Sequence, residues 1–289
     1  MPYDHIRLYK TREGIVAEAD AKYYALQHTG WTELVNRENL HAHLSKVLSS
    51  LNPTEINLTN EDIQIPMDSQ EIWAAGVTYF RSREARMDES RESGGATFYD
   101  KIYDAERPEL FFKATPARTS ATGEPVYIRK DSHWNVPEPE LTLFISSSGT
   151  IEGYTIGNDM SSRDIEGENP LYLPQAKAYT RSAALGPCLL VQSTPLHSNT
   201  TISLSIIRDN RKAFENSIEI SQIKRTFEDL VKYLFMECEF PDGVLLMTGT
   251  GIIPGDDFTL KAGDQVDITI KNIGTLSNVV GYNPRSNVR

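Results

Sequence analysis

The sequence predicts an α+β, mostly β protein in which a mixed β-sheet roll follows a small N-terminal α+β domain. Three observations favour this fold class. Short apolar or alternating segments recur from residue 109 onward, turn signals separate them, and one helical segment interrupts them at residues 225–237. A parallel α/β array would alternate strands with helices throughout, so we expect a roll or sandwich of sheets.

The first 69 residues predict the small domain. Residues 5–11 and 14–20 are typical of two short strands joined by a turn, and residues 22–27 of a third. Four apolar residues then follow at roughly helical spacing: Leu34, Leu40, Leu44 and Val47. We therefore expect one helix over residues 32–50, with Thr32 as its N-cap.

A second, larger domain is predicted over residues 70–289. Its expected strands are at residues 72–80, 109–114, 141–146, 151–159, 187–192, 201–209, 244–249 and 265–273. The segment RSREARMDESR at residues 81–91 alternates charges at helical spacing and is followed by Gly94-Gly95. Such a segment is usually a solvated helix face, but it could also be a lid that closes over a site.

Composition and charge disfavour several functional classes. Hydrophobic residues make up 39% and charged residues 24% of the chain, as in an ordinary globular protein. The formal charge of −11 argues against nucleic acid or an anionic membrane as a partner. No apolar run reaches the ~20 residues that span a bilayer, and the N-terminus lacks a signal-peptide core. Cys188 and Cys238 fit no metal or redox spacing, so we expect two reduced, buried thiols in a cytoplasmic protein.

The most informative segment is PEPELTLFISSSGTIEGYTIGND, which predicts a β-hairpin. A two-residue turn at Ser148-Gly149 would pair Ser147 with Thr150. In that register Glu140 faces Gly157 and Glu138 faces Asp159. Because side chains alternate along a strand, we expect five residues on one face: Glu138, Glu140, Thr142, Thr155 and Asp159. The other face would be apolar, with Leu141, Leu143, Ile145, Tyr154 and Ile156.

This register predicts a metal site. It places three carboxylates within roughly 5–8 Å of one another, and like charges so close destabilise a sheet unless they are neutralised. A hard divalent cation would remove the repulsion, and all-oxygen ligands suit Mg²⁺ better than structural zinc. The alternative interpretation places Glu138 and Glu140 on a solvent-facing edge.

Over residues 70 to 285 the sequence resembles the fumarylacetoacetate hydrolase superfamily. The matching blocks occur in family order: PEPEL, GYTIGNDMSSRD, QAKAYTRSAALGP, DGVLLMTGTG and KAGDQVDITIKNIGTLSN. The resemblance implies that Glu138, Glu140 and Asp159 bind Mg²⁺, with Mn²⁺ or Ca²⁺ as alternatives. It further implies a small 2-oxo acid substrate and a homodimer or homotetramer.

One departure from the family pattern bears on the reaction. Family hydrolases and decarboxylases carry a His-x-x-Glu pair after a G-x-N-Y segment, and this sequence has Ser82 and Ala85 at those positions. Neither residue can act as a base near neutral pH, which disfavours carbon–carbon hydrolysis.

Three segments resemble the sequences of the 2-keto-3-deoxy-pentonate dehydratases, which act on acids such as 2-keto-3-deoxy-D-arabinonate. These segments are VTYFRSREAR, RPELFFKAT and PQAKAYTRSAALGP. By that resemblance Lys177 and Glu109 are the acid–base residues. The residues expected near the substrate are Arg81, Ser82, Arg83, Thr248, Gly249, Thr250 and Gly251. A base would remove a C3 proton while an acid assists departure of the C4 hydroxyl. Which of Lys177 and Glu109 does which stays open.

The leading hypothesis is therefore a metal-dependent lyase that dehydrates a 2-keto-3-deoxy-pentonate, such as the arabinonate or xylonate, to 2-oxoglutarate semialdehyde. The first alternative is a hydrolase of the fumarylacetoacetate or acylpyruvate type, or an oxaloacetate decarboxylase. The second is a non-catalytic metal-binding scaffold with the same fold. A scaffold has no need of a lysine beside the metal, so Lys177 speaks against it.

Overall fold

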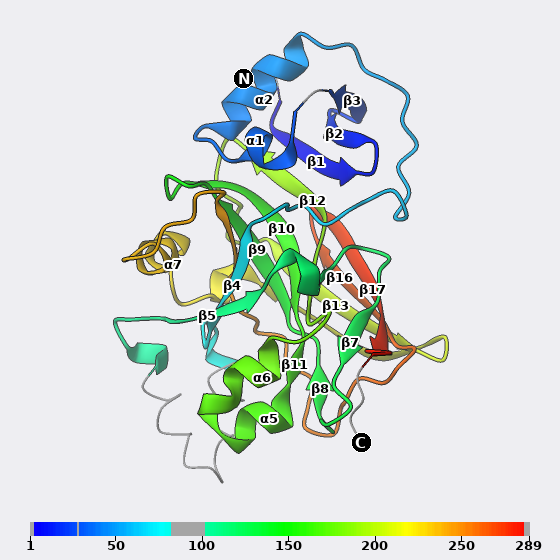
Figure 1. Ribbon diagram of the computed structural model, residues 1–289, viewed down its shortest axis with the longest axis vertical. Coiled ribbons are helices and arrows are strands. Elements are labelled where there is room, and N and C mark those ends of the chain that lie inside the picture. Colours follow the sequence, from blue (N-terminus) through cyan, green and yellow to red (C-terminus); the bar gives the residue numbers. More distant parts are fainter. Residues whose placement is uncertain (1–2, 28, 82–101, 286–289) are drawn as a thin grey trace.

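The structure is a computed structural model that describes residues 3–27, 29–81 and 102–285 (Figure 1). Its strands are β1 (His5–Thr11), β2 (Gly14–Ala19), β3 (Lys22–Leu26), β4 (Glu71–Gly76), β5 (Glu109–Ala114), β6 (Thr119–Ser120), β7 (Val126–Ile128), β8 (Asn135–Val136), β9 (Pro139–Ile145), β10 (Ile151–Asp159), β11 (Ser161–Ser162), β12 (Ala183–Gln192), β13 (Thr201–Arg208), β14 (Arg211–Glu219), β15 (Val244–Met247), β16 (Gln265–Ile270) and β17 (Gly274–Tyr282). Its helices are α1 (Trp31–Val35), α2 (Leu40–Ser49), α5 (Arg163–Glu168), α6 (Leu173–Lys177) and α7 (Phe227–Leu234), with short 3₁₀ turns at Pro116–Arg118, Pro170–Tyr172 and Ile220–Gln222. The predicted mostly β, mixed-sheet class is confirmed.

A ten-stranded mixed sheet forms the centre of the molecule. Its strand order is β3-β2-β1-β12-β10-β9-β15-β4-β5, and β6 joins it beside β12. The β15–β4 and β12–β6 pairs are parallel, whereas the other neighbours are antiparallel. The three N-terminal strands therefore continue the sheet of the larger domain, because β1 pairs directly with β12. The boundary near residue 70 stays a prediction.

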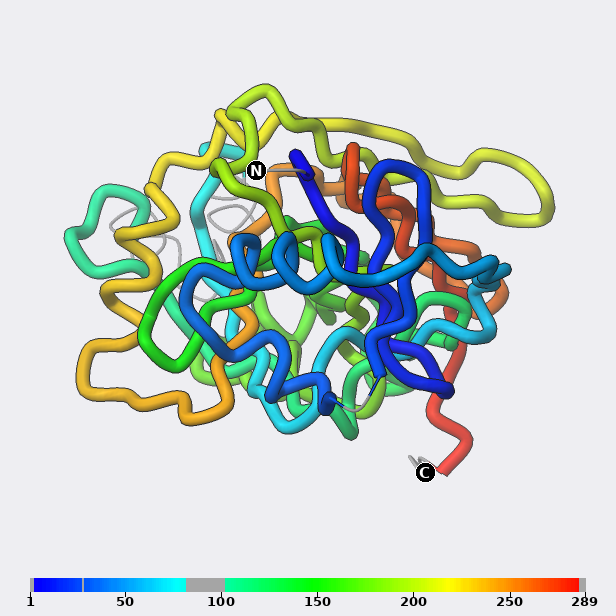
Figure 2. Tube along the Cα trace, turned by 90° about the horizontal axis from the view of Figure 1, so that it is seen from above, coloured from blue at the N-terminus to red at the C-terminus, as the bar shows by residue number. Residues whose placement is uncertain are grey.

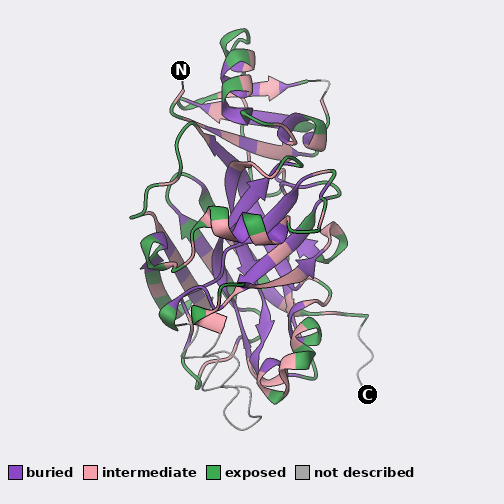
Figure 3. Cartoon of the chain, turned by 90° about the vertical axis from the view of Figure 1, so that its left-hand side faces the viewer, coloured by how far each residue is buried: buried purple, intermediate pink, exposed green. Residues whose placement is uncertain are grey.

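A second sheet of five strands, in the order β14-β13-β16-β17-β7, packs across one face of the large sheet. The main core lies between the two sheets and draws side chains from both, including Leu141, Leu190, Leu204 and Ile268. Figure 3 shows these central strands as buried along most of their length. Burying apolar surface drives such packing, and every residue of β9 is buried because both faces of the large sheet are covered.

The opposite face of the large sheet is covered by the N-terminal unit. Leu40, Leu44 and Leu48 of α2 belong to a second apolar cluster that also contains Phe144 of β9 and Leu189 of β12. Seen from above, the N-terminal segment lies in front of the rest of the chain (Figure 2). Within the described part of the chain, no helix is long and apolar enough to cross a membrane.

The predicted single helix over residues 32–50 is wrong in two respects. It is divided into α1 and α2, because Asn39 takes a left-handed conformation with φ of 56°. Thr32 is not the N-cap, which is Gly30. Thr32 lies inside α1, and its backbone N–H and hydroxyl both donate to Asp68 at 3.0 Å. The carboxylate of a distant residue thus satisfies the backbone N–H of Thr32 in the first turn of α1, where a local cap was expected.

The remaining elements agree with prediction apart from a few omissions. Each expected strand has a counterpart, and the expected helix at residues 225–237 is α7. The sequence reading missed β14, β17, the short strands β6, β7, β8 and β11, and the helices α5 and α6. Cys188 and Cys238 are both free, but only Cys188 is buried, so the expectation for Cys238 is wrong. The charged segment and its proposed lid lie outside the described residues, except for Arg81.

Candidate active site

The β9–β10 hairpin has the predicted register at its functional end. Glu140 pairs with Gly157, and the backbone N–H of Asp159 donates to the carbonyl oxygen of Glu138 at 3.0 Å. The predicted two-residue turn is wrong, because Ile145 pairs with Ile151 and five residues form the loop. A bulge between Ile151 and Gly153 then inserts one residue and restores the register. The predicted apolar face is confirmed: its five residues all belong to the main core.

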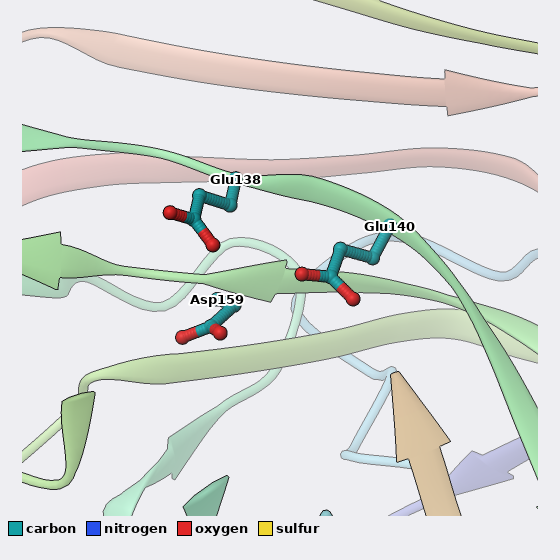
Figure 4. Close-up of side chains that lie close together, drawn as sticks. All are labelled: Glu138, Glu140 and Asp159. Carbon is teal, nitrogen blue, oxygen red and sulfur yellow. The ribbon is translucent and has the colours of Figure 1, made fainter. Parts of the chain in front are cut away.

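Glu138, Glu140 and Asp159 converge on one point (Figure 4). One carboxylate oxygen from each lies within 4.8 Å of the other two. Their exposed fractions are only 5%, 1% and 1%, so the solvent-facing alternative for the glutamates is wrong. A buried charge is costly unless it is paired or binds a metal, and this group needs compensation.

Three buried cations provide part of that compensation. Arg163 and Lys177 each lie 2.6 Å from an oxygen of Glu138. Lys177 also lies 3.2 Å from Oδ2 of Asp159, and Lys113 lies 2.5 Å from Oδ1 of Asp159. All three cations thus lie against Glu138 or Asp159 rather than Glu140.

Glu140 differs from the other two carboxylates because no cation contacts it directly in the described ion pairs. Oε2 of Glu140 accepts a hydrogen bond from the backbone N–H of Gly249. Burial raises the pKa of Glu140 well above its ordinary value, and the charges of Asp159 and Glu138 raise it further. A cation placed among the three carboxylates would favour the ionised form and reverse this shift. Of the three carboxylates, Glu140 is therefore the one whose ionised form a bound metal would stabilise most.

Lys113 is a site residue that sequence reasoning missed. It lies in β5, within the segment ELFFKA, and is fully buried. Burial lowers the pKa of Lys113, while the carboxylate of Asp159 opposes that shift. A lysine inside an apolar strand was the available signal, since lysine is almost never fully buried without a partner.

Arg163 was missed for a different reason. It belongs to the block NDMSSRD, in which the resemblance assigns a role only to the first aspartate, Asp159. Its guanidinium contacts Glu138 at 2.6 Å and lies 3.9 Å from Glu166, which in turn accepts a hydrogen bond from Ser161 at 2.9 Å. These contacts hold the side chain of Glu138 toward Asp159.

Glu109 begins β5 opposite Gly76, the last residue of β4. Its carboxylate lies directly over Gly76: a Cβ atom on that glycine would be 2.1 Å from Oε2 of Glu109. Gly76 therefore makes room for this carboxylate. Its catalytic role stays a proposal.

The segment Thr248–Gly251 passes beside Glu140. The hydroxyl of Thr248 donates to the carbonyl oxygen of Leu141 at 2.9 Å, and Gly249 donates to Glu140. Thr250 is 5% exposed, and Gly251 packs tightly against Tyr79. Contacts of these four residues with a substrate carboxylate stay a proposal. Arg81 is exposed, and Ser82 and Arg83 lie outside the described residues.

The residues present fit a divalent metal ion. The donor set consists only of carboxylate oxygens, which hard cations prefer, and three protein ligands leave coordination positions open. Because the pKa of Glu140 is raised, a bound cation is needed to keep all three carboxylates ionised at the same time. A structural zinc ion would instead favour cysteine and histidine.

The mixed-sheet roll and its buried acidic triad define a class of metal-dependent enzymes. The family model for the fumarylacetoacetate hydrolase C-terminal region matches residues 72–281, and the chain belongs to this family. It is 46% identical over 217 residues to a probable 2-keto-3-deoxyxylonate dehydratase from Haloferax volcanii, covering 75% of this chain and 74% of the relative. It is 44% identical over 233 residues to 2-dehydro-3-deoxy-D-arabinonate dehydratase from Saccharolobus solfataricus, covering 80% and 76%.

A solved structure agrees with these relatives. It is that of 2-keto-3-deoxy-D-arabinonate dehydratase complexed with magnesium and 2,5-dioxopentanoate. It matches this chain with a TM-score of 0.80 and 35% identity, covering 96% of this chain and 99% of its own. The resemblance in fold thus includes the N-terminal unit.

Proposed function

We propose that this protein is a Mg²⁺-dependent hydro-lyase that removes water from a 2-keto-3-deoxy-pentonate and forms 2,5-dioxopentanoate, which is 2-oxoglutarate semialdehyde. The observation that carries the proposal is the buried triad of Glu138, Glu140 and Asp159 in contact with Lys177. The two dehydratase relatives supply the reaction class.

The triad would hold Mg²⁺, which when bound supplies Lewis-acid polarisation of the substrate's oxo group and makes the C3 hydrogens more acidic. Three cations already lie against Glu138 and Asp159, and Mg²⁺ would add two positive charges to this site, which favours an anionic 2-oxo acid.

Lys177 and Glu109 would share the proton transfers. Lys177 reaches the triad from the end of α6, and Glu109 stands at the start of β5. One would take the C3 proton, and the other would protonate the departing C4 hydroxyl, which leaves as water. A proton must then move from C5 to C3, so that the C5 alcohol becomes an enol and then the aldehyde. The same pair could carry this second transfer, because each group is left in the complementary protonation state after the first.

The alternative of carbon–carbon cleavage lacks a specific observation in its favour. It needs an activated water, and the aligned positions carry Ser82 and Ala85. The non-catalytic scaffold has no use for Lys177, a fully buried lysine within 2.6 Å of a metal ligand.

The decisive experiment incubates the protein and Mg²⁺ with 2-keto-3-deoxy-arabinonate, 2-keto-3-deoxy-xylonate and an acylpyruvate, with product identification by mass spectrometry. We expect 2,5-dioxopentanoate from a pentonate. Pyruvate released from the acylpyruvate with a higher kcat/KM would replace this proposal by the hydrolase. Lys177→Met should be inactive yet still bind metal.

We also propose that the protein works as a homodimer or homotetramer in the cytoplasm. Support comes from its similarity to the family and from its two free cysteines. Light scattering on the purified protein would test the assembly. A monomeric species with full activity would contradict it.

A further inference from the structure

The ammonium group of Lys113 has three acceptors around it. They are Oδ1 of Asp159 at 2.5 Å, the carbonyl oxygen of Met160 at 2.9 Å and the carbonyl oxygen of Lys177. The two carbonyl oxygens accept hydrogen bonds from the ammonium group, and the carboxylate of Asp159 pairs with its charge. Lys113 is therefore a fully buried cation held by three groups of the protein.

Each of these acceptors belongs to a segment of the candidate active site. Asp159 is a proposed metal ligand, and Met160 follows it. Lys177 is the last residue of α6, where the carbonyl groups have no partner within the helix. Lys113 therefore joins β5 to the end of β10 and to the end of α6 in one place.

The two oxygens of Asp159 are divided between two lysines. Oδ1 faces Lys113, whereas Oδ2 lies 3.2 Å from Nζ of Lys177. Lys113 thus holds Lys177 twice: directly through its carbonyl oxygen, and indirectly through the carboxylate that its ammonium group contacts. A shift of about 1 Å at a reacting group is enough to cost roughly 10²-fold in rate.

The charge of Lys113 also acts on the metal. Lys113, Lys177 and Arg163 place three positive charges against the triad. A divalent cation entering the triad is repelled by each of the three. Removal of one of these positive charges would make the site more negative by one charge before the metal binds, so the metal would be attracted more strongly.

We propose that Lys113 is a positioning residue with two opposing effects: it aligns Lys177 and Asp159 for turnover, and it weakens metal binding by the triad. The turnover part rests on the proposed dehydratase function. The metal part does not. Loss of Lys113 should therefore give a slower enzyme that binds its metal more tightly, a combination that general damage to the fold does not produce.

The test uses Lys113→Met, which keeps the length of the side chain and removes its charge. Mn²⁺ binding is measured by electron paramagnetic resonance, and dehydration of the pentonate by steady-state kinetics with saturating Mg²⁺. We expect the Kd for Mn²⁺ to fall about tenfold and kcat to fall at least about tenfold. Should Lys113→Met not fold, Lys113→Gln, which keeps N–H donors without the charge, is measured in its place.

Two further variants separate the effects. Arg163→Met also removes one positive charge, but Arg163 contacts Glu138 rather than Asp159. It should tighten Mn²⁺ binding with a smaller loss of kcat. Lys212→Met removes an exposed lysine that pairs with Glu215 and should change neither quantity.

Weaker Mn²⁺ binding together with a lower kcat in the Lys113 variant would overturn the proposal and leave only a structural role. An unchanged kcat would overturn it as well. If the wild-type protein binds Mn²⁺ but dehydrates no pentonate, the proposed function fails, and the Mn²⁺ measurement still decides whether Lys113 opposes the metal.

Discussion

The backbone N–H of Gly249 donates a hydrogen bond to Oε2 of Glu140, where β15 ends beside β9. Gly249 has a φ of 93°, and a Cβ atom there would lie 2.0 Å from Oγ1 of Thr78 and 2.9 Å from the carbonyl oxygen of Ala75. Only glycine permits this close approach, which directs an N–H group at the carboxylate that no described cation contacts.

Gly249→Ala should therefore destabilise the protein by roughly 2–4 kcal/mol and weaken metal binding, because the added methyl group must displace Thr78 or the backbone. Gly263 offers a matched control, since it has the same φ of 93° but nothing within 4 Å of the added atom. Gly263→Ala should cost only about 1 kcal/mol. Urea denaturation of both variants measures the difference, and equal losses would show that the collision at Gly249 is relieved.

Asp159→Asn should abolish metal binding and metal-dependent activity while the fold persists. The amide keeps the shape of the carboxylate but supplies no charge for the metal or for Lys113 and Lys177. Isothermal titration with Mg²⁺ and circular dichroism together test this expectation. Full activity of the variant, or of the wild-type protein in excess chelator, would refute the assignment of Asp159.

Val77 directly follows β4 and has a strained backbone conformation. The next residue, Thr78, donates its hydroxyl to the carbonyl oxygen of Thr248. Val77 is buried and has a φ of 52°, a conformation that a β-branched residue rarely adopts. Val77→Gly should be more stable than Val77→Ala by about 1 kcal/mol, although glycine is the weaker residue in ordinary strands. The comparison isolates the strain, because both variants lose the valine side chain. Greater stability of the alanine variant in thermal denaturation would show that the strain is negligible.

The lowered pKa of Asp68 predicts that the free energy of unfolding depends on pH. Burial alone would raise the pKa of Asp68, but hydrogen bonds from Lys10 and from Thr32 outweigh it, and the pKa is lowered from 3.8. A carboxylate with a lowered pKa in the folded state stabilises the protein above its unfolded pKa, and this contribution is lost as the pH falls through the folded value.

Asp68→Asn should therefore be less stable than the wild type at neutral pH, by about 1 kcal/mol or less because solvent screens this partly exposed pair. The difference should shrink as the pH falls below 3.8. Urea denaturation across this range measures it. A difference that does not change with pH would assign the effect to packing rather than to charge.

The hairpin shows why part of the site was predictable from sequence. Alternation of side chains indicated which residues share a face, and the expected turn at Ser148-Gly149 set the register that pairs Glu138 with Asp159. The turn itself was not predictable in this way, because Ser146 forms hydroxyl contacts with Ser148 and Thr150 that favour a longer loop. The bulge compensates for the longer loop, so the register is right although the turn is wrong.

The partners of Lys113 and Asp68 could not be predicted from the sequence. The apolar strand around Lys113 signals a buried lysine, but only the structure shows that Asp159 and the end of α6 lie beside it. Likewise, a local N-cap was expected for the first helix, and a residue 36 positions away bonds to Thr32 instead. Both contacts depend on how distant segments pack, which local propensity does not encode.

The bulge also couples the hairpin to the N-terminal unit. Its inserted residue, Glu152, accepts hydrogen bonds from the backbone N–H groups of Asn39 at 3.2 Å and Leu40 at 2.8 Å, where α2 begins. The residue that restores the register of the three carboxylates therefore also binds the start of α2. A chain that began at residue 70 would leave β12 paired with β10 but without β1 on its other side, so that its N–H and C=O groups on that side would be open beside an uncovered apolar face. An open sheet edge can pair with other molecules, so we expect the N-terminal unit to reduce aggregation of the large sheet.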